Sequence, residues 1–193
     1  MGRTGRNPEG MRCPHSAATP AVFEVQTATK VLRYAGRDGV FAAATTFGGR
    51  WRVTSADGTA LFALAPAGPA GSDDRDVVPH GEQPVATIMR DRRHVGSWLV
   101  LDPDGGVIFR ATAAEPYQVN LVDAGGVLTG QLWATATAIT ADFGAPSALH
   151  CVTLALPLFF ATTGGLRVDP LESPAPLALN AEPLALDAPL VWD

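Results

Sequence analysis

The feature that most constrains the fold is an apolar run near the C-terminus, from Ser147 to Thr163. On a helix, its large apolar side chains would point in almost every direction, and His150 and Thr153 are the polar interruptions. A helix that is apolar on all sides must be enclosed by protein or by lipid. We therefore expect the rest of the chain to be organised around this run as a core element.

Two secondary structures compete for this run, because its apolar residues also alternate at a period of two, as in a buried strand. Pro157 disfavours both, since it costs a helix about 3 kcal/mol and removes a hydrogen-bond donor from a strand ladder. Length favours a helix, with Pro146 or Ser147 as its start and Gly164-Gly165 as its stop. We predict a helix over residues 147–163, kinked or ending near Pro157.

A membrane span is a further alternative, because the run is slightly shorter than the roughly 20 residues that cross a bilayer. Pro157 and the polar residues weaken that interpretation. No cluster of basic residues flanks the run to set an orientation. We therefore expect no transmembrane span.

The length of 193 residues suits one domain that folds without metals or disulfides, because such a chain buries roughly 70% of its unfolded surface. Cys13 lies in a polar segment and Cys151 in the apolar run, so we expect them not to pair. No secretory signal opens the sequence, and we predict a reducing cytoplasm. The net charge of −5 argues against a nucleic-acid partner, because binding phosphates needs a basic surface.

The chain divides into three parts. Residues 1–20 have no periodic apolar face, which predicts a disordered tail. Residues 21–165 form the predicted domain, in which short apolar or alternating segments are separated by turn residues, the pattern of consecutive antiparallel hairpins. Its first predicted strands are 22–26, 30–34, 39–46, 50–55 and 59–65. Residues 66–84 are predicted as a long polar loop.

The third part, residues 166–193, is an extended tail rich in proline and leucine. In it Pro176-Leu-Ala-Leu-Asn-Ala recurs as Pro183-Leu-Ala-Leu-Asp-Ala. Prolines at this spacing forbid a regular helix and favour extended structure. Two interpretations stay open: a strap over the domain's own surface, or a segment that binds a partner protein.

The predicted domain contains a repeat. The segment Trp51-Arg-Val-Thr-Ser-Ala-Asp-Gly-Thr-Ala-Leu-Phe62 matches Trp98-Leu-Val-Leu-Asp-Pro-Asp-Gly-Gly-Val-Ile-Phe109 at an offset of 47 residues. A looser third copy runs over residues 119–128. Each copy has glycine in its turn, where a positive φ costs least. Repeated hairpins predict a sheet that is closed or folded on itself.

These hairpins, with two Trp-x-Val-x-x-x-Asp-Gly segments and one apolar run after them, resemble the Tubby C-terminal-like superfamily, which includes the phospholipid scramblases and the LURP-one-related proteins. The resemblance covers residues 22–165. It implies a mainly β fold, a closed antiparallel barrel threaded by a hydrophobic helix, here residues 147–163. It also implies contact with membrane lipids or partner proteins in place of catalysis.

Scramblase activity is not carried over by this resemblance. The sequence lacks the cysteine cluster associated with scramblase lipidation. Asp102-Pro-Asp104-Gly105 supplies two carboxylates but lacks the later glutamate and the wider spacing of a calcium-binding EF-hand loop. We predict a turn at this position.

Motifs for catalysis are missing, since the sequence contains no Gly-x-Ser-x-Gly, no Walker loop and no Gly-x-Gly-x-x-Gly. His150 and Cys151 are adjacent, but consecutive side chains diverge in helices and strands, so they do not form a dyad. His15, His80 and His94 lack metal-ligand spacing. We expect no enzymatic activity, no cofactor and no metal site.

The candidate binding residues are Arg90, Arg92, Arg93 and Arg110. Three of them lie between two predicted strands, and Arg110 follows the second Trp segment. Guanidinium groups bind phosphate oxygens through forked hydrogen bonds, so a hairpin tip of this kind can hold an anionic lipid headgroup. The alternative is an ordinary solvated turn, partly neutralised by Asp91.

Together these features predict a non-enzymatic module that binds lipid or protein, in the cytoplasm or peripherally at a membrane. Two other functions stay open. A barrel can enclose a cavity for a small apolar ligand, although an apolar run that fills the barrel argues against this. A hydrolase would need a site assembled from residues distant in sequence.

Overall fold

The structure is a computed structural model, and it describes residues 20, 22–27, 31–80, 83–115, 117–143 and 150–166, with His150 described by its backbone alone. These residues form twelve strands and one helix. The strands are β1 (Val22–Gln26), β2 (Leu32–Gly36), β3 (Gly39–Phe47), β4 (Arg50–Ser55), β5 (Ala60–Pro66), β6 (Arg75–Pro79), β7 (Ala86–Arg90), β8 (Ser97–Leu101), β9 (Val107–Glu115), β10 (Gln118–Asp123), β11 (Leu128–Ala134) and β12 (Ala138–Asp142), and the helix is α1 (His150–Thr163). The predicted tails lie outside the described residues, apart from Pro20 and Leu166.

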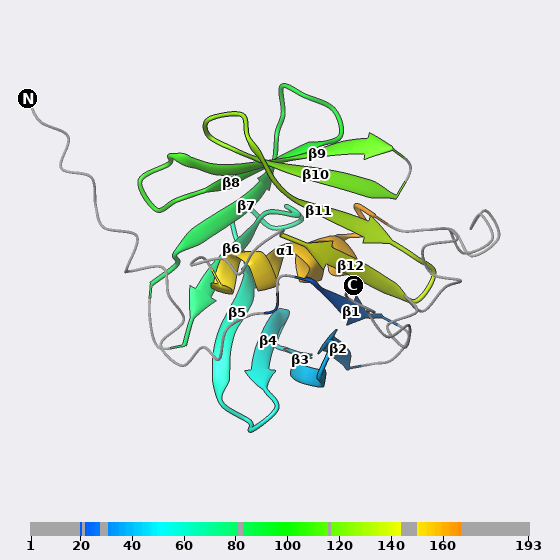
Figure 1. Cartoon of the computed structure of the whole chain (residues 1–193). Coiled ribbons are helices and arrows are strands. Elements are labelled where there is room, and N and C mark those ends of the chain that lie inside the picture. The colour runs from blue at the N-terminus through cyan, green and yellow to red at the C-terminus, as the bar shows by residue number, and fades with distance from the viewer. Residues whose placement is uncertain are drawn as a thin grey trace, which may run out of the picture.

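The sheet is a closed barrel in which each strand pairs antiparallel with the next along the chain. Closure comes from β1 and β12, where Val22 to Gln26 pair with Asp142 to Ala138. Figure 1 shows the strands wrapped around α1. The predicted closed antiparallel barrel with one central helix is therefore confirmed.

The helix α1 fills the barrel, and each of its residues from Cys151 to Phe160 is buried. The prediction that the apolar run is enclosed by protein is confirmed, and the strand alternative is excluded for the described part of the run. Within the described residues, no helix has the length and hydropathy of a membrane span. The predicted start at 147 lies outside the described residues.

Of the two alternatives predicted for the helix at Pro157, a kink or an end, the end is excluded. The helix continues through Pro157 to Thr163, and Gly164 then adopts a φ of 75°, the left-handed conformation that commonly ends helices. A proline inside a helix costs about 3 kcal/mol. Here the flanking Leu156 and Leu158 are fully buried, and burial contributes roughly 1.5–3 kcal/mol for each such side chain, so the cost is offset.

A hydrogen bond and an aromatic contact join the helix to the barrel wall. The hydroxyl of Tyr34, which is fully buried on β2, donates to the carbonyl of Leu154 over 3.0 Å. Burial raises the pKa of Tyr34 well above its ordinary value. Near the other end of α1, the rings of Phe160 and Trp98 meet edge to face, with centroids 4.9 Å apart. The helix is thus fixed to the barrel at two levels.

The predicted loop over residues 66–84 is wrong in its middle, because it contains β6. Val77 of this strand is fully buried and pairs with Leu64 of β5 on one side and Ala86 of β7 on the other. Aspartates and prolines surround the strand in sequence, and a single fully buried valine gives too short an apolar signal to predict it. Neighbouring strands supply the missing context. Other predicted strands are close to observed ones, and 22–26 and 50–55 are identical to β1 and β4.

The sequence repeat corresponds to a repeated hairpin with a β-bulge. In β4–β5 and β8–β9 the pairing shifts register at the same place, directly after Val53↔Phe62 and Val100↔Phe109. The third copy, β10–β11, shifts after Leu121↔Gly130. A fourth hairpin, β2–β3, which the sequence pattern did not reveal, shifts after Tyr34↔Ala42. Bulges bend strands and increase their twist, which assists barrel closure.

The expectation that Cys13 and Cys151 do not pair falls partly outside the described residues; Cys151 itself is fully buried in α1. The other cysteine of the sequence, Cys13, lies outside the described residues. The cytoplasmic location stays a prediction.

Candidate functional site

Antiparallel pairing places alternate turns at opposite ends of the barrel. We call one end the arginine end; it holds the turns that leave odd-numbered strands, including β3–β4, β5–β6 and β7–β8. We call the other the aspartate end; it holds the turns that leave even-numbered strands, including β4–β5, β8–β9 and β10–β11. The bulged hairpins β2–β3, β4–β5, β8–β9 and β10–β11 turn at the aspartate end, whereas β9–β10, which also shifts register, turns at the arginine end.

The two ends differ in charge. The turns and strand ends at the aspartate end carry Asp38, Asp57, Asp102, Asp104, Asp123 and Asp142, with Arg37 as the cation among them. Those at the arginine end carry Arg33, Arg50, Arg75, Arg90, Arg92 and Arg93 together with Asp73, Asp74, Asp76, Asp91 and Glu115. Within the described residues, the acidic net charge is therefore concentrated at the aspartate end.

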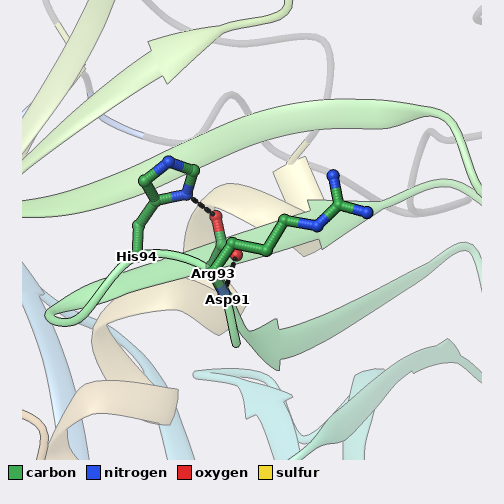
Figure 2. Close-up of polar contacts among 3 residues, drawn as sticks. All are labelled: Asp91, Arg93 and His94. Carbon is green, nitrogen blue, oxygen red and sulfur yellow. Dashed lines mark hydrogen bonds and ion pairs between the residues drawn. The ribbon is translucent and has the colours of Figure 1, made fainter.

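The β7–β8 turn at the arginine end is organised by Asp91. One carboxylate oxygen, Oδ1, accepts the backbone N–H of Arg93 over 2.9 Å, and the other, Oδ2, lies 2.8 Å from Nδ1 of His94 (Figure 2). An ionised carboxylate only accepts hydrogen bonds, so Nδ1 of His94 carries the proton. The backbone N–H of Asp91 also donates to the carbonyl of Ser97, which closes the turn.

These contacts keep Asp91 ionised. The backbone hydrogen bond from Arg93 is the largest cause that lowers the pKa of Asp91, followed by the hydrogen bond from His94, and the charge of Arg110 adds a smaller effect. The carboxylate is buried and directed into the turn. Asp91 therefore shapes the tip and does not form an ion pair with a guanidinium of that tip.

The structure brings three of the four candidate arginines together. Arg90 ends β7, while Arg92 and Arg93 lie in the turn, and all three are exposed. Figure 2 shows the guanidinium of Arg93 pointing away from the Asp91 carboxylate. Arg110 is not part of the β7–β8 turn and lies on the outer face of β9, between buried Phe109 and Ala111, from where its charge still reaches Asp91. Among the described residues, none of the four guanidiniums forms a salt bridge.

The sequence interpretation missed two apolar side chains at the arginine end. Phe47, the last residue of β3, is 80% exposed, and Val95 in the β7–β8 turn is 97% exposed. The sequence feature that could have identified them is their position beside glycines in turns, Gly48 and Gly96. Placing both turns at one end required the correct number of strands between them, which the sequence did not reveal.

A second candidate is a pocket of about 470 Å³ near the aspartate end, open to solvent. Its wall includes Phe109, Leu128 and Phe143 from the barrel, with Thr153 from α1. This size falls within the range of small-molecule sites. Phe143 is the last described residue before residues 144–149, which lie outside the described residues, so we assign the pocket no ligand.

The predicted turn at Asp102 is observed. Its Oδ1 accepts the backbone N–H groups of Asp104 and Gly106 over 2.9 and 2.7 Å, and Gly105 has a φ of 82°. Asp123 makes the equivalent bonds to Gly125 and Val127. These carboxylates shape their own turns. No group of three or more potential metal-ligating side chains occurs in the described part of the chain.

Comparisons with known proteins add a distant structural similarity. No family model matches the chain, and no curated protein gives a significant match. The chain is similar to the X-ray structure of a protein from Arabidopsis thaliana. The two share 10% sequence identity with a TM-score of 0.41, and the match covers 76% of this chain and 93% of that one. A similarity this distant carries no argument about family or function.

Proposed function

We propose that this chain is a non-catalytic binding module of the Tubby C-terminal-like type, and that its β7–β8 tip binds anionic phospholipid. The observation that carries the proposal is the arrangement of charge in that tip. The carboxylate of Asp91 is occupied by Arg93 N–H and His94, while the guanidiniums of Arg92 and Arg93 are exposed and form no salt bridge among the described residues.

Such a tip suits phosphate groups at a membrane surface. Exposed guanidiniums bind phosphate oxygens in a bidentate manner, and each basic residue near an anionic surface contributes about 1 kcal/mol. The Asp91 contacts hold the turn in one conformation, which reduces the entropy lost on binding. Arg110 does not belong to this tip, so we propose Arg90, Arg92 and Arg93 as the headgroup-binding residues and leave Arg110 out.

The filled barrel supports a binding role in preference to an internal catalytic site. The side chains of α1 and the inward residues of the strands form one continuous core. Enzymes that bind small substrates use concave sites with convergent polar groups. The proposed contact instead uses a projecting tip, which suits a surface such as a bilayer.

The test is flotation with phosphatidylcholine vesicles, with and without about one-third phosphatidylserine, or with a phosphoinositide. Arg90→Ala/Arg92→Ala/Arg93→Ala should weaken binding to anionic vesicles on the order of 100-fold, because it removes three contributions of about 1 kcal/mol. Binding by the wild type should fall at high salt.

The matched control is Arg33→Ala/Arg37→Ala/Arg52→Ala, which removes the same charge from exposed positions outside the tip. It should retain most of the binding. The proposal fails if the wild type does not float with anionic vesicles, or if the two triple variants lose binding equally.

A further inference from the structure

We infer that the β3–β4 and β7–β8 tips of the arginine end dock on an anionic bilayer, with Phe47 and Val95 inserted between the headgroups as two apolar anchors. This inference rests on the proposed function and deepens it, because it assigns a second contact, an orientation and a mode of binding that the arginine tip alone does not specify.

The first observation is that the two anchors project from the same end of the barrel. Phe47 ends β3 and Val95 precedes β8, and both turns leave odd-numbered strands of a closed antiparallel barrel. In such a barrel these turns must point the same way. One flat surface can therefore contact both tips.

The second observation is that each anchor lies beside a guanidinium. Phe47 pairs directly with Arg50 across the β3–β4 turn, where Gly48 and Gly49 have φ values of 56° and 75°. Val95 lies two residues after Arg93 in the β7–β8 turn. Single exposed apolar side chains are common in proteins. Two at projecting tips, each beside an arginine, match the composition of segments that enter the headgroup region of anionic membranes.

The turn between these tips limits the contact. The β5–β6 turn carries Asp73 and Asp74, and the guanidinium of Arg75 is engaged by the carbonyls of Ser72 and Asp74 over 2.9 and 2.8 Å. Carboxylates repel an anionic surface, so this turn does not contribute to binding. The β3–β4 and β7–β8 tips on either side of it therefore make the contact, and insertion is shallow.

Charge selects the arginine end over the aspartate end. The aspartate end also exposes apolar side chains, among them Val127 at 61% and Leu128 at 54%. Aspartates surround them, including Asp104 and Asp123, and an anionic surface repels these charges. The exposed apolar residues at this end therefore serve as controls for Phe47 and Val95, because they are also exposed and apolar but lie among aspartates.

The experiment compares Phe47→Ser/Val95→Ser with Val127→Ser/Leu128→Ser. Affinity for phosphatidylcholine vesicles containing about one-third phosphatidylserine is measured by flotation, and insertion is measured by the rise in surface pressure of a monolayer of the same lipids. We expect the first variant to lose about tenfold or more in affinity and most of the pressure rise. We expect the second variant to behave as the wild type.

All four substituted side chains are exposed, so both variants should retain the urea midpoint of the wild type, which identifies any folding defect. If the wild type binds anionic vesicles and Phe47→Ser/Val95→Ser binds as well with the same pressure rise, the insertion is disproved and the arginine contact stands. An equal loss in both variants would overturn the orientation. A wild type that ignores anionic vesicles overturns the proposed function itself.

Discussion

At the aspartate end, the carboxylates of Asp102 and Asp123 each accept two backbone N–H groups of their own turns. At the arginine end, Arg92 is exposed and the guanidinium of Arg93 points away from the Asp91 carboxylate of its turn (Figure 2). The charged side chains of the turns therefore have different roles at the two ends. Aspartate is short enough to bond its own turn, while arginine is long and extends into solvent. Net charge at a barrel end therefore does not by itself identify a binding surface.

The helix has a polarity that fits these ends. It follows β12, which ends at the aspartate end, and Phe160 reaches Trp98 near the arginine end. The N-terminus of a helix carries partial positive charge and the C-terminus partial negative charge. The first turn of α1 contains no acidic residue and its last turn no basic one. In place of charged residues in the helix itself, the barrel turns supply negative charge at the aspartate end, near the helix N-terminus, and arginines at the other end, near the helix C-terminus.

The largest expected effect is the difference in the free energy of unfolding between a substitution in the core near the arginine end and one at an exposed tip of that end. Phe160→Ala should lower the free energy of unfolding by about 3–5 kcal/mol, because it leaves a cavity beside Trp98. Phe47→Ala should change it by less than about 0.5 kcal/mol, because that ring is exposed. Urea denaturation followed by tryptophan fluorescence measures both. Similar losses would show that the β3–β4 tip has a structural role.

A smaller effect is expected from packing near the aspartate end. A Cβ at Gly130 would lie 2.8 Å from the ring of Phe143 and 2.9 Å from the carbonyl oxygen of Asp142. Gly130→Ala should therefore destabilise the protein by about 1–3 kcal/mol. The control Gly125→Ala meets a flexible carboxylate at 3.2 Å and should cost less. Thermal melts of both variants test this prediction. Equal melting temperatures would contradict the tight packing around Gly130.

The turn carboxylates should contribute less again. Asp102→Ala and Asp123→Ala each remove an acceptor of two backbone hydrogen bonds, and we expect a loss of about 1 kcal/mol for each. Asp38→Ala, in an exposed turn of the same end, serves as the comparison and should be close to neutral. Chemical denaturation of the three variants tests this. Should Asp38→Ala cost as much as the other two, the role assigned to the turn carboxylates would be wrong.

The smallest expected effect is a pH dependence shared by the two ends. Hydrogen bonds from Ser55 and Thr59 lower the pKa of Asp57 to about 2, and the bonds from Arg93 and His94 lower the pKa of Asp91. A lowered folded-state pKa gives stability that is present above the unfolded value, 3.8 for Asp57, and is lost as the pH falls through the folded value.

Asp57→Asn should make the acid-induced loss of stability shallower between pH values of about 4 and 2, and Asp91→Asn should make it shallower below the ordinary aspartate value of 3.8. Urea denaturation over this range measures the slope. Asp91→Asn should also loosen the arginine tip and weaken vesicle binding, whereas Asp57→Asn should leave binding unchanged. Unchanged slopes in both variants would contradict the assigned pKa shifts.

Much of the fold follows from local sequence. The predicted strands 22–26 and 50–55 match the structure, because alternation at a period of two depends on neighbouring residues alone. The Asp-Gly turns and the enclosed helix were also predicted, because their sequence signals likewise depend on residues close together in the chain. The strand β6 was missed, since Val77 is buried by β5 and β7, which lie close only after the barrel has closed.

That missed strand had a consequence for the candidate site. With β6 treated as loop, the β7–β8 turn would fall at the end opposite to the β3–β4 turn, and Phe47 would not share a surface with Arg92 and Arg93. Adding or removing one strand moves every later turn to the opposite end of the barrel. Arg110 shows the same limitation, because its position on the outer wall of β9 depends on register and not on its distance in sequence from Arg93.

The sequence by itself determined the alternating strands, the glycine turns, the repeated hairpin and the apolar run, because each depends on residues close together in the chain. The tertiary structure alone decided which turns share an end, that Tyr34 reaches the carbonyl of Leu154, and that Phe47 and Val95 are exposed. These features depend on the number of strands and the closure of the barrel, and both arise from contacts between distant residues.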